Sequence, residues 1–501
     1  MNCDAKHRYG QLEAKRTGLV TRSERYAELT IPSVCQKDGY DEGTQELNLD
    51  YQSVGAQCAN NLVNKMMLAL FAPSRPFLRL DLPGFQMNAL MQALGLEEAQ
   101  LREQLAIAEK EAMKVLDRSA SRPVLYELMT HLVVTGNAVR YMEDGVMRVF
   151  GIKSYVVRRN NKGQMAELIT REKVCKDDMP SELHGFFKQG DKDVFYYRWW
   201  KWDTGRQLFF EKQYVEDNLI TLDKYQGRYK REDMPIQAHC WRLASGSHYG
   251  IGMIEDYVAD LEGLSMLSEA EVNGAILASE FRWLVNPGGQ TRPEDFKTTN
   301  NGDSLPGEAG DVSLVVASEA AAALQVVGSV ADKYIRRLGA AFLMAQSVQR
   351  DAERVTAEEI RILANELETT LGGIYSRQAV DLQLPLAFWM LGQVDSEILK
   401  DSDLQPTIIT GLDALSRNGD LENLQLFMND CMPFVTMPPE FQDYFKMTAI
   451  FSDLAAGRGI QSSTYLHSQA EVDLLRETRS QQYQQQQQEL MATEAQLKGS
   501  K

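Results

Sequence analysis

The residue types that carry most protein chemistry are sparse in this chain and do not form a familiar motif. The nearest approach to a metal-ligand cluster is His239-Cys240 followed by His248, and ordinary packing explains that spacing better than a metal site does. The phosphate-binding G-x-x-x-x-G-K-[ST] loop, the G-x-S-x-G nucleophile elbow and the H-E-x-x-H zinc motif are absent from the sequence. Gly250-Ile251-Gly252 stands alone, and we interpret it as a loop cap. The sequence therefore predicts no enzyme and implies no metal or cofactor.

Two groups of basic residues could contact nucleic acid. Residues 188–231 hold eleven aromatic, ten basic and seven acidic side chains, and alternating rings and cations can stack bases. We favour a simpler interpretation, a sheet with an aromatic core face and a charged, solvated face. Outside that range the candidate cations are Arg336, Arg337, Arg350 and Arg354. In a single copy these are scattered surface charges, and their meaning depends on whether several copies bring them to one axis.

The elements that must position these residues follow from hydrophobic periodicity. Helical spacing predicts helices over residues 1–30, 51–71, 100–117, 124–135, 255–279 and 320–344. A period of two from about 139 to 241 predicts an antiparallel sheet. Two further strand candidates, Phe281–Val285 and Val312–Val316, lie between the two long helices. The order is a long helix leading out, a small β module at its tip, and a long helix returning.

The last third of the chain is marked by caps and breaks. Thr356 and Glu359 form a capping box that begins a helix. Gly372-Gly373 predicts a kink, and Pro385 predicts a second bend. Beyond about Ser396 we expect helices joined by loops, and then a Gln-rich tail that is frayed or disordered.

Composition limits the protein classes that remain. The chain has 501 residues, 44% apolar and 25% charged, and its formal net charge of −17 argues against tight, sequence-reading DNA binding but not against a DNA-facing role. Its length suggests about three domains.

No apolar run reaches the roughly 20 residues of a membrane helix, and the polar N-terminus does not resemble a secretory signal. Six widely spread cysteines are typical of reduced thiols, which predicts synthesis in the cytoplasm.

Several blocks carry a family resemblance. They are Glu13-Ala14-Lys15-Arg16-Thr17-Gly18-Leu19, Tyr51-Gln52-Ser53-Val54-Gly55-Ala56, Met67-Leu68-Ala69-Leu70-Phe71, Ser154-Tyr155-Val156-Val157, Leu284-Val285-Asn286-Pro287, the long block 348–361, Glu366–Tyr375 and Leu382-Gln383-Leu384-Pro385-Leu386. Together the blocks resemble the portal protein, or head-to-tail connector, of short-tailed bacteriophages of the podovirus and autographivirus type. The matches run in order from about residue 13 to about residue 420 and thin out between Cys175 and His239.

The resemblance implies an α+β, mainly helical portal fold that assembles as a dodecameric ring around a central DNA channel. It places the regions of the family on the following residues: wing on 1–254, outgoing stem helix on 255–279, clip on 280–325, returning stem helix on 326–344, tunnel loop on 345–355, a wing/crown connecting helix on 356–394, crown on 395–470, and a Gln-rich tail on 471–501.

The resemblance also implies a function and partners. The ring would stand at the unique capsid vertex of the virion, pass double-stranded DNA without sequence specificity during packaging and ejection, and dock the terminase large subunit and the tail adaptor. Major capsid and scaffolding proteins would be further partners, the host bacterial cytoplasm the place of synthesis, and no membrane would be involved. The alternatives are another ring-forming junction protein such as a tail adaptor, or a DNA-packaging enzyme without recognisable motifs.

Site residues follow from the same resemblance. Gln349, Arg350 and Arg354 of the tunnel loop would approach DNA, and Arg336 and Arg337 would line or brace the stem. In the alternative interpretation Arg350 and Arg354 pair with Asp351, Glu353 or Glu358 and stabilise the loop between subunits.

The clip candidates for docking the motor and the adaptor are Arg282, Trp283, Arg292, Asp295, Phe296 and Lys297. The alternative there is a polar, solvent-exposed loop. We also expect that strands Phe281–Val285 and Val312–Val316 could pair across neighbouring subunits, which would cover edges that are prone to aggregation when open.

Overall fold

The computed structural model divides the chain into two compact units, Met1–Gly411 and Leu412–Lys501. Nearly all of the residues that the structure describes lie in the first unit; they are residues 4–47, 50–72, 77–81, 98–118, 121–143, 145–187, 193–231, 233–279, 281–292, 294, 304, 307–316, 320–344, 357–394, 407–410, 426, 428–430 and 432–433.

The helices of this part are α1 (Ala5–Glu13), α2 (Thr17–Glu28), α3 (Val54–Leu70), α5 (Glu98–Arg118), α6 (Ser121–Thr135), α7 (Met253–Ser279), α9 (Ala320–Ala341), α10 (Ala357–Leu371), α11 (Ile374–Gln378) and α12 (Leu384–Gly392). The strands are β1 (Leu78–Asp81), β2 (Asn137–Glu143), β3 (Val146–Phe150), β4 (Tyr155–Arg159), β5 (Met165–Cys175), β6 (Asp193–Asp203), β7 (Leu208–Val215), β8 (Asn218–Leu219), β9 (Arg228–Tyr229), β10 (Ile236–Cys240), β11 (Phe281–Val285), β12 (Val312–Val316) and β13 (Thr407–Thr410).

The region expected to form one antiparallel sheet forms two. One has the strand order β10-β2-β3, and the other has the order β4-β5-β6-β7-β8, with β9 paired to β7. Aromatic rings fill the space between the two sheets, where the Trp200 ring is fully buried 5.8 Å from that of Tyr141. The sheet predicted in residues 188–231 is confirmed, but its two faces do not divide into one aromatic and one charged face. Tyr197 and Tyr214 lie on the opposite face from Trp200, and the charged Arg198 and Glu211 are buried.

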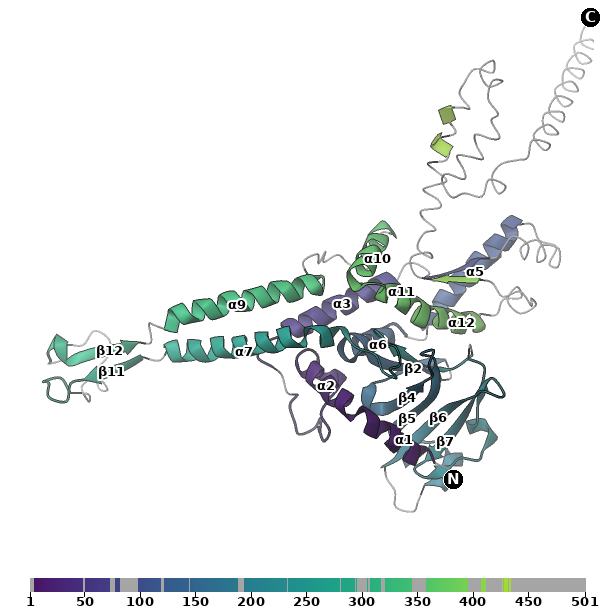
Figure 1. Ribbon diagram of the computed structural model, residues 1–501, viewed down its shortest axis with the longest axis horizontal. Helices are drawn as coiled ribbons and strands as arrows, with labels where there is room; N and C mark the ends of the chain where they lie inside the picture. The colour runs from purple at the N-terminus through teal and green to yellow at the C-terminus, as the bar shows by residue number, and fades with distance from the viewer. Residues whose placement is uncertain are drawn as a thin grey trace, which may run out of the picture. The chain divides into compact units, whose positions relative to one another are not determined.

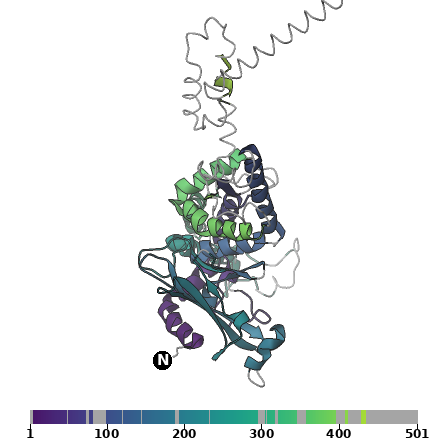
Figure 2. The same cartoon turned by 90° about the vertical axis from the view of Figure 1, so that its right-hand side faces the viewer.

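Helix α1 covers part of the outer face of the larger sheet (Figure 2). Ala5, Tyr9 and Leu12, spaced for one helical face, pack on Val156, Ile169, Tyr197 and Tyr214 of the sheet. At the elbow between α1 and α2, the buried Arg16 guanidinium donates to the backbone carbonyls of Ile152 and Lys153. The resemblance block at residues 13–19 thus fastens the two N-terminal helices to the sheet.

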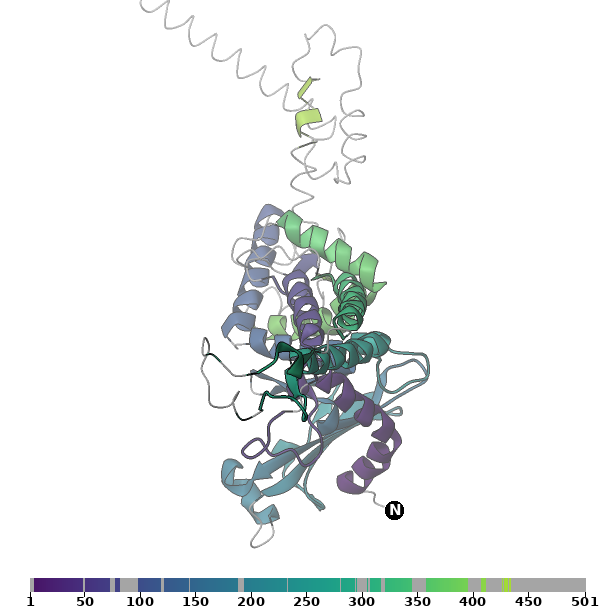
Figure 3. The same ribbon diagram turned by 90° about the vertical axis from the view of Figure 1, so that its left-hand side faces the viewer.

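The long helices α7 and α9 lie antiparallel, and the β11–β12 pair lies at their far end (Figure 1). We call these two helices the α7–α9 hairpin; Figure 3 views it from its β11–β12 end. The predicted helix, β module and helix are confirmed, and both strands have the predicted bounds. β11 and β12 pair with each other within the chain, which leaves only their outer edges for the expected pairing across subunits.

The C-terminal part confirms two predictions and corrects one. Gly373 takes a positive φ of 86° and separates α10 from α11, while Pro385 lies in the first turn of α12 after a π-helical turn, Ala379–Gln383. The expectation of helices and loops beyond Ser396 is wrong at Thr407–Thr410, because this segment is strand β13 and pairs with β1. None of the described helices is long and apolar enough to span a bilayer.

Candidate channel and docking surfaces

Arg337 ties the two helices of the α7–α9 hairpin together. Its Nε lies 3.1 Å from Oδ2 of Asp260 on α7, and its guanidinium lies 4.8 Å from the centre of the Tyr334 ring. Nearer the sheets, the Tyr257 and Phe342 rings meet edge to face at 5.3 Å. Of the two interpretations, lining or bracing, these contacts favour bracing for Arg337.

Charge is distributed unequally over the hairpin. Helix α7 contains six acidic residues and no basic residue. Four of the six pair with arginines of other elements: Glu255 with Arg22, Asp256 with Arg242, Asp260 with Arg337 and Glu262 with Arg25. Closer to the β11–β12 end, Glu269 and Glu271 form no ion pair with any described residue. The outer half of α7 therefore carries uncompensated negative charge.

Two of the cations on α9 have no acidic partner among the described residues. Lys333 and Arg336 are exposed, and helical geometry places them on the side of α9 that is turned away from α7. Arg336 is thus available to an external anion or to another copy of the chain, whereas the neighbouring Arg337 is engaged with Asp260.

Apolar side chains lie exposed on both flanks of α7. Met266, Ala270 and Leu277 recur at helical spacing on one flank, with the polar Asn273 in the same row; Met266 is 68% and Leu277 61% exposed. Val272, 49% exposed, continues the opposite flank, which nearer the sheets carries the buried Leu261. Exposed apolar residues at regular spacing typically mark a contact with another protein surface.

Helix α3 contacts residues on both sides of the segment that joins α9 to α10. At the start of the segment the Asn61 amide donates to the Phe342 carbonyl at 2.8 Å, and the Cys58 sulfur lies 3.4 Å from that of Met344. On α10, Glu366 lies 3.9 Å from Lys65 of α3. Helix α3 therefore contacts both the last described residues before the segment identified as the tunnel loop and helix α10, which follows that segment.

Two side chains from later in the chain donate hydrogen bonds to backbone carbonyls at the C-terminal end of α3. The Tyr375 hydroxyl donates to the Ala69 carbonyl at 3.3 Å, and the Gln383 amide donates to the Leu70 carbonyl at 2.5 Å. Helix ends leave such carbonyls without partners inside the helix, and buried ones need a donor from elsewhere. These two contacts fix α11 and α12 to α3.

A buried carboxylate organises the end of the β module. Asp311, 8% exposed, accepts hydrogen bonds from the backbone N–H groups of Gln290 and Thr291, at 2.7 and 3.2 Å, and from the Thr291 hydroxyl. Asp311 is not predictable as a site residue from the sequence, because its position one residue before β12, in a turn-rich stretch, does not reveal its hydrogen-bond partners.

The structure places only some of the predicted site residues. Arg336 and Arg292 are exposed, Arg337 braces the hairpin, and Arg282 and Trp283 lie on β11 opposite Val315 and Leu314. Outside the described residues lie Asp295, Phe296, Lys297, Gln349, Arg350, Arg354 and Thr356. Glu359 lies in the first turn of α10, and its side chain is outside the described set. The docking and tunnel-loop predictions thus stay predictions.

The weak metal-ligand candidate resolves into packing. His239 is fully buried, and burial together with the nearby Arg140 and Arg159 charges holds the pKa of its imidazole well below the usual value. His248 accepts a hydrogen bond from the backbone N–H of Arg159, whose guanidinium reaches the Ala238 carbonyl and the Cys240 sulfur. Among the described residues no group of three His, Cys, Asp or Glu side chains could hold a metal ion.

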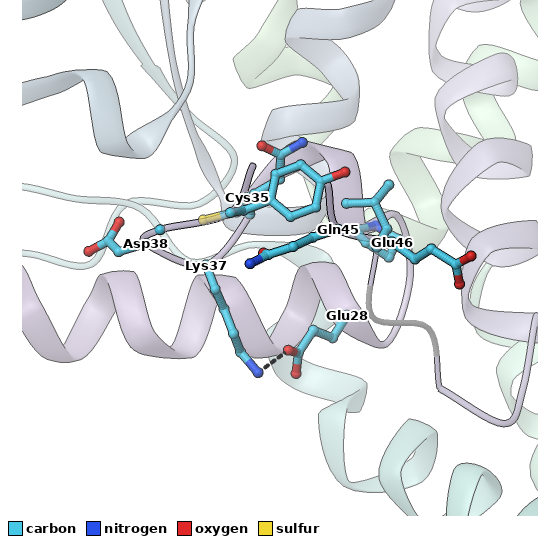
Figure 4. Close-up of a pocket in the computed structure, with 11 residues that line it drawn as sticks. Glu28, Cys35, Lys37, Asp38, Gln45 and Glu46 are labelled. Atoms are coloured by element: carbon cyan, nitrogen blue, oxygen red, sulfur yellow. Dashed lines mark ion pairs between the residues drawn. The ribbon is translucent and has the colours of Figure 1, made fainter. Parts of the chain in front are cut away.

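A pocket of about 320 Å³ lies between the end of α2 and the segment 32–47 that follows it (Figure 4). Glu28 and Lys37 form an ion pair at its edge, and Cys35 is a lining residue. Burial raises the pKa of the Cys35 thiol to about 11, so the thiol stays protonated at neutral pH and is a poor nucleophile. The pocket is therefore structural in character rather than a reactive centre.

Comparison with known proteins decides the family. The model of the bacteriophage head to tail connecting protein family matches residues 3–466. The chain belongs to this family. The portal protein of Enterobacteria phage T3 is 34% identical over 441 residues, covering 84% of this chain and 80% of the relative. The portal protein of Escherichia phage T7 is 34% identical over 442 residues, with the same two coverages.

Among solved structures, a chain from the neck of an empty gene transfer agent particle, determined with C6 symmetry, is a structural match. The alignment covers 82% of this chain and 90% of that chain. The identity is 13% and the TM-score 0.39, which is too low to establish a shared fold. The sequence relatives confirm the resemblance and with it the function of a portal protein at the head–tail junction of the virion. They do not favour the tail-adaptor alternative.

Proposed function

We propose that twelve copies of this portal protein close into a ring at one capsid vertex, with the α7–α9 hairpins around a central channel for double-stranded DNA. The observation that carries the proposal is the exposed apolar row Met266, Ala270 and Leu277 on one flank of α7, with exposed Val272 on the other, in a member of the portal family. A solvated single copy would leave Met266 and Leu277 in water, whereas packing between neighbours buries them.

A ring suits these flanks because they differ from each other. A two-fold dimer uses the same patch on both copies, whereas contact between two different patches repeats from copy to copy and closes into a ring when the rotation allows. One flank of α7 carries Met266 and Leu277, and the other carries Val272. Each copy then offers one flank to each of its two neighbours.

The charge distribution fits DNA that passes without being held. Each arginine or lysine that contacts a phosphate adds affinity through counterion release, so a strongly basic channel would retain the duplex. A chain with a net charge of −17 and an acidic α7 supplies few such contacts. Arg336, together with Gln349, Arg350 and Arg354 of the tunnel loop, would form the sparse cationic rings that centre the duplex without sequence specificity.

The β11–β12 end of the hairpin is the proposed docking surface for the terminase large subunit during packaging and for the tail adaptor afterwards. Its candidate contacts are Arg282, Trp283, Arg292, Asp295, Phe296 and Lys297. Chemistry on DNA would belong to the motor, since the portal chain itself acts as a structural connector and not as an enzyme. Synthesis takes place in the host cytoplasm, and capsid and scaffolding proteins meet the outside of the ring.

Native mass measurement tests the ring directly. The expected result is a particle with twelve times the mass of the 56.6 kDa chain, seen as a ring with a central channel by electron microscopy. A chain that stays monomeric at micromolar concentration would contradict the proposal.

Packaging assays test the channel residues. Arg350→Gln combined with Arg354→Gln should change the amount of DNA packaged if these residues contact DNA, and should lower ring stability if they instead pair with carboxylates of the loop. If both readouts stay at the wild-type level, neither interpretation of the two arginines holds.

A further inference from the structure

A cluster of exposed cations lies on the larger sheet, within residues 188–231 and away from the α7–α9 hairpin in the sequence. Its charged members are Lys201 of β6, Arg206 of the turn that follows, Lys212 of β7 and Arg228 of β9. Strand register places Lys201 opposite Phe210, and Phe210 opposite Arg228. We call Lys201, Arg206, Phe210, Lys212 and Arg228 the β6–β7 patch.

The patch occupies the outer face of the sheet, beyond the part that α1 covers. Tyr197 and Tyr214 lie beneath α1, and residues alternate along a strand, so Lys201 and Lys212 share the face of these tyrosines. The acidic residue in the same row, Glu167, is already engaged by Arg8 and Arg158, at 2.7 and 3.0 Å. Its charge is therefore not available to Lys201.

The four cations of the patch form no ion pair with any described residue. Other exposed lysines of the same sheet region do: Lys173 lies 3.1 Å from Asp193, and Lys224 lies 2.9 Å from Glu182. In a chain with a net charge of −17, four unpaired cations on one face are a local excess of the opposite sign. Such an excess favours an anionic partner.

The aromatic ring at the centre of the patch orients its arginines. The guanidinium carbons of Arg206 and Arg228 lie 5.5 and 5.8 Å from the centre of the Phe210 ring. A guanidinium held against a ring keeps its N–H groups free to bind a carboxylate or a phosphate in a forked geometry. Phe210 is itself half-buried, and a nucleobase would have to compete with both guanidiniums for its ring.

We propose that the β6–β7 patch docks a short, carboxylate-rich segment of a partner protein. Acidic residues limit the extent of the positive surface: Asp203 follows Lys201 on the same face, and its carboxylate is fixed by the backbone N–H groups of Gly205 and Arg206. A long duplex, with phosphates at regular intervals over many turns, would meet this carboxylate, whereas a short acidic segment fits between the cations. The proposal does not depend on ring formation or on a DNA channel.

The test measures binding of a fluorescein-labelled deca-glutamate peptide to the full chain by fluorescence anisotropy, at about 50 and about 300 mM NaCl. Arg206→Gln with Arg228→Gln should weaken binding about tenfold at the lower salt concentration and flatten its salt dependence. The matched control, Lys173→Gln with Lys224→Gln, removes the same charge from paired lysines of the same region and should change affinity less than about twofold.

A second variant keeps the test decisive if the arginine variant does not fold. Lys201→Gln with Lys212→Gln alters the patch without touching Phe210, and it should also weaken peptide binding. The proposal is overturned if wild-type protein does not bind the peptide, or if both patch variants bind it like the control. It is equally overturned if a 20-base-pair duplex binds more tightly than the peptide through the same arginines, since the patch would then be a nucleic-acid surface.

Discussion

At the scale of single residues, four of the resemblance blocks that the structure describes contain side chains that hold neighbouring elements together. Arg16, Tyr375 and Gln383 each bind backbone carbonyls of a neighbouring element. Gln52 does the same twice: its amide donates to the Leu29 carbonyl, and its oxygen accepts from the Gly55 backbone N–H. A buried backbone carbonyl needs a hydrogen-bond donor, so replacing one of these side chains would leave a carbonyl without a partner. The resemblance therefore identifies the fold more directly than it identifies a site.

Gly136 provides a prediction about close backbone approach. Its φ is +76°, and a Cβ atom placed there would lie 2.3 Å from the Gly252 nitrogen. Gly136→Ala should therefore lower stability by about 3 kcal/mol or more, since the backbone itself must move. Gly246 has a φ of +79° with open space around it, so Gly246→Ala should cost only about 1 kcal/mol, the conformational part. Thermal melting of both variants separates the two costs, and equal losses would contradict the prediction.

Glu167 provides a prediction about buried charge. Its side chain is 1% exposed, pairs with Arg8 and Arg158, and accepts a hydrogen bond from the Trp199 indole at 3.1 Å. Because both arginines keep contact with solvent, Glu167→Gln should lower stability by about 2 kcal/mol, less than the loss of a fully buried partner. The control is Lys224→Gln, which breaks an exposed pair and should leave the melting temperature nearly unchanged.

The same carboxyl predicts a pH dependence. Burial alone would raise the pKa of Glu167, but hydrogen bonds and charge from Arg8 and Arg158 outweigh it and lower the pKa below the usual 4.5. A group with a lowered pKa in the folded state stabilises fully above its unfolded value and loses that contribution as the pH falls through the folded value. The stability difference between wild type and Glu167→Gln should thus be constant near neutral pH and shrink below about pH 4.5. A difference that grows on acidification would contradict this assignment.

At the scale of elements, the features that the sequence predicts correctly are those with a local signal. The bounds of β11 and β12 and the order of the long helices follow from nearby residues, by periodicity and turn composition. The pairing of strands far apart in the sequence was not predictable. Strand β1 pairs with β13, more than 300 residues later, and no local pattern specifies such a partner. For the same reason Arg337 was selected as a cation, but its partner Asp260 on α7 was not.

Asp311 provides a prediction at this scale. Asp311→Ala removes the acceptor of three hydrogen bonds from Gln290 and Thr291, and leaves buried donors without partners. Each such donor costs about 1–3 kcal/mol, which is enough to open the end of the β module locally. Limited proteolysis should then cut near residues 286–292 faster than in wild type, while the melting temperature of the sheets stays the same. Unchanged cleavage would show that β11 and β12 hold the turn without Asp311.

At the scale of the whole molecule, charge and apolar surface have separate roles. The net charge of −17 is spread over the chain, yet in the part of the chain that the structure describes the β6–β7 patch and the outer side of α9 both carry cations without an ion pair. Exposed apolar residues, by contrast, recur along the flanks of α7. The proposals made above thus assign different surfaces to different partners: the α7 flanks to neighbouring copies, sparse cations to DNA, and the basic sheet face to an acidic segment.

Assembly provides the last prediction. Met266→Gln with Leu277→Gln replaces two exposed apolar side chains, 68% and 61% accessible in the single chain, without adding charge. Burying each in a neighbour contact is worth about 1.5–3 kcal/mol, and the loss repeats at every contact of the ring, so native mass spectra should shift from the ring towards single chains. The fold should be unaffected, because neither side chain packs in the core of its own chain. Val146→Gln, 57% exposed on β3, is the matched control and should leave the ring intact. A double variant that still forms complete rings at nanomolar concentration would show that the α7 flanks do not hold neighbouring copies together.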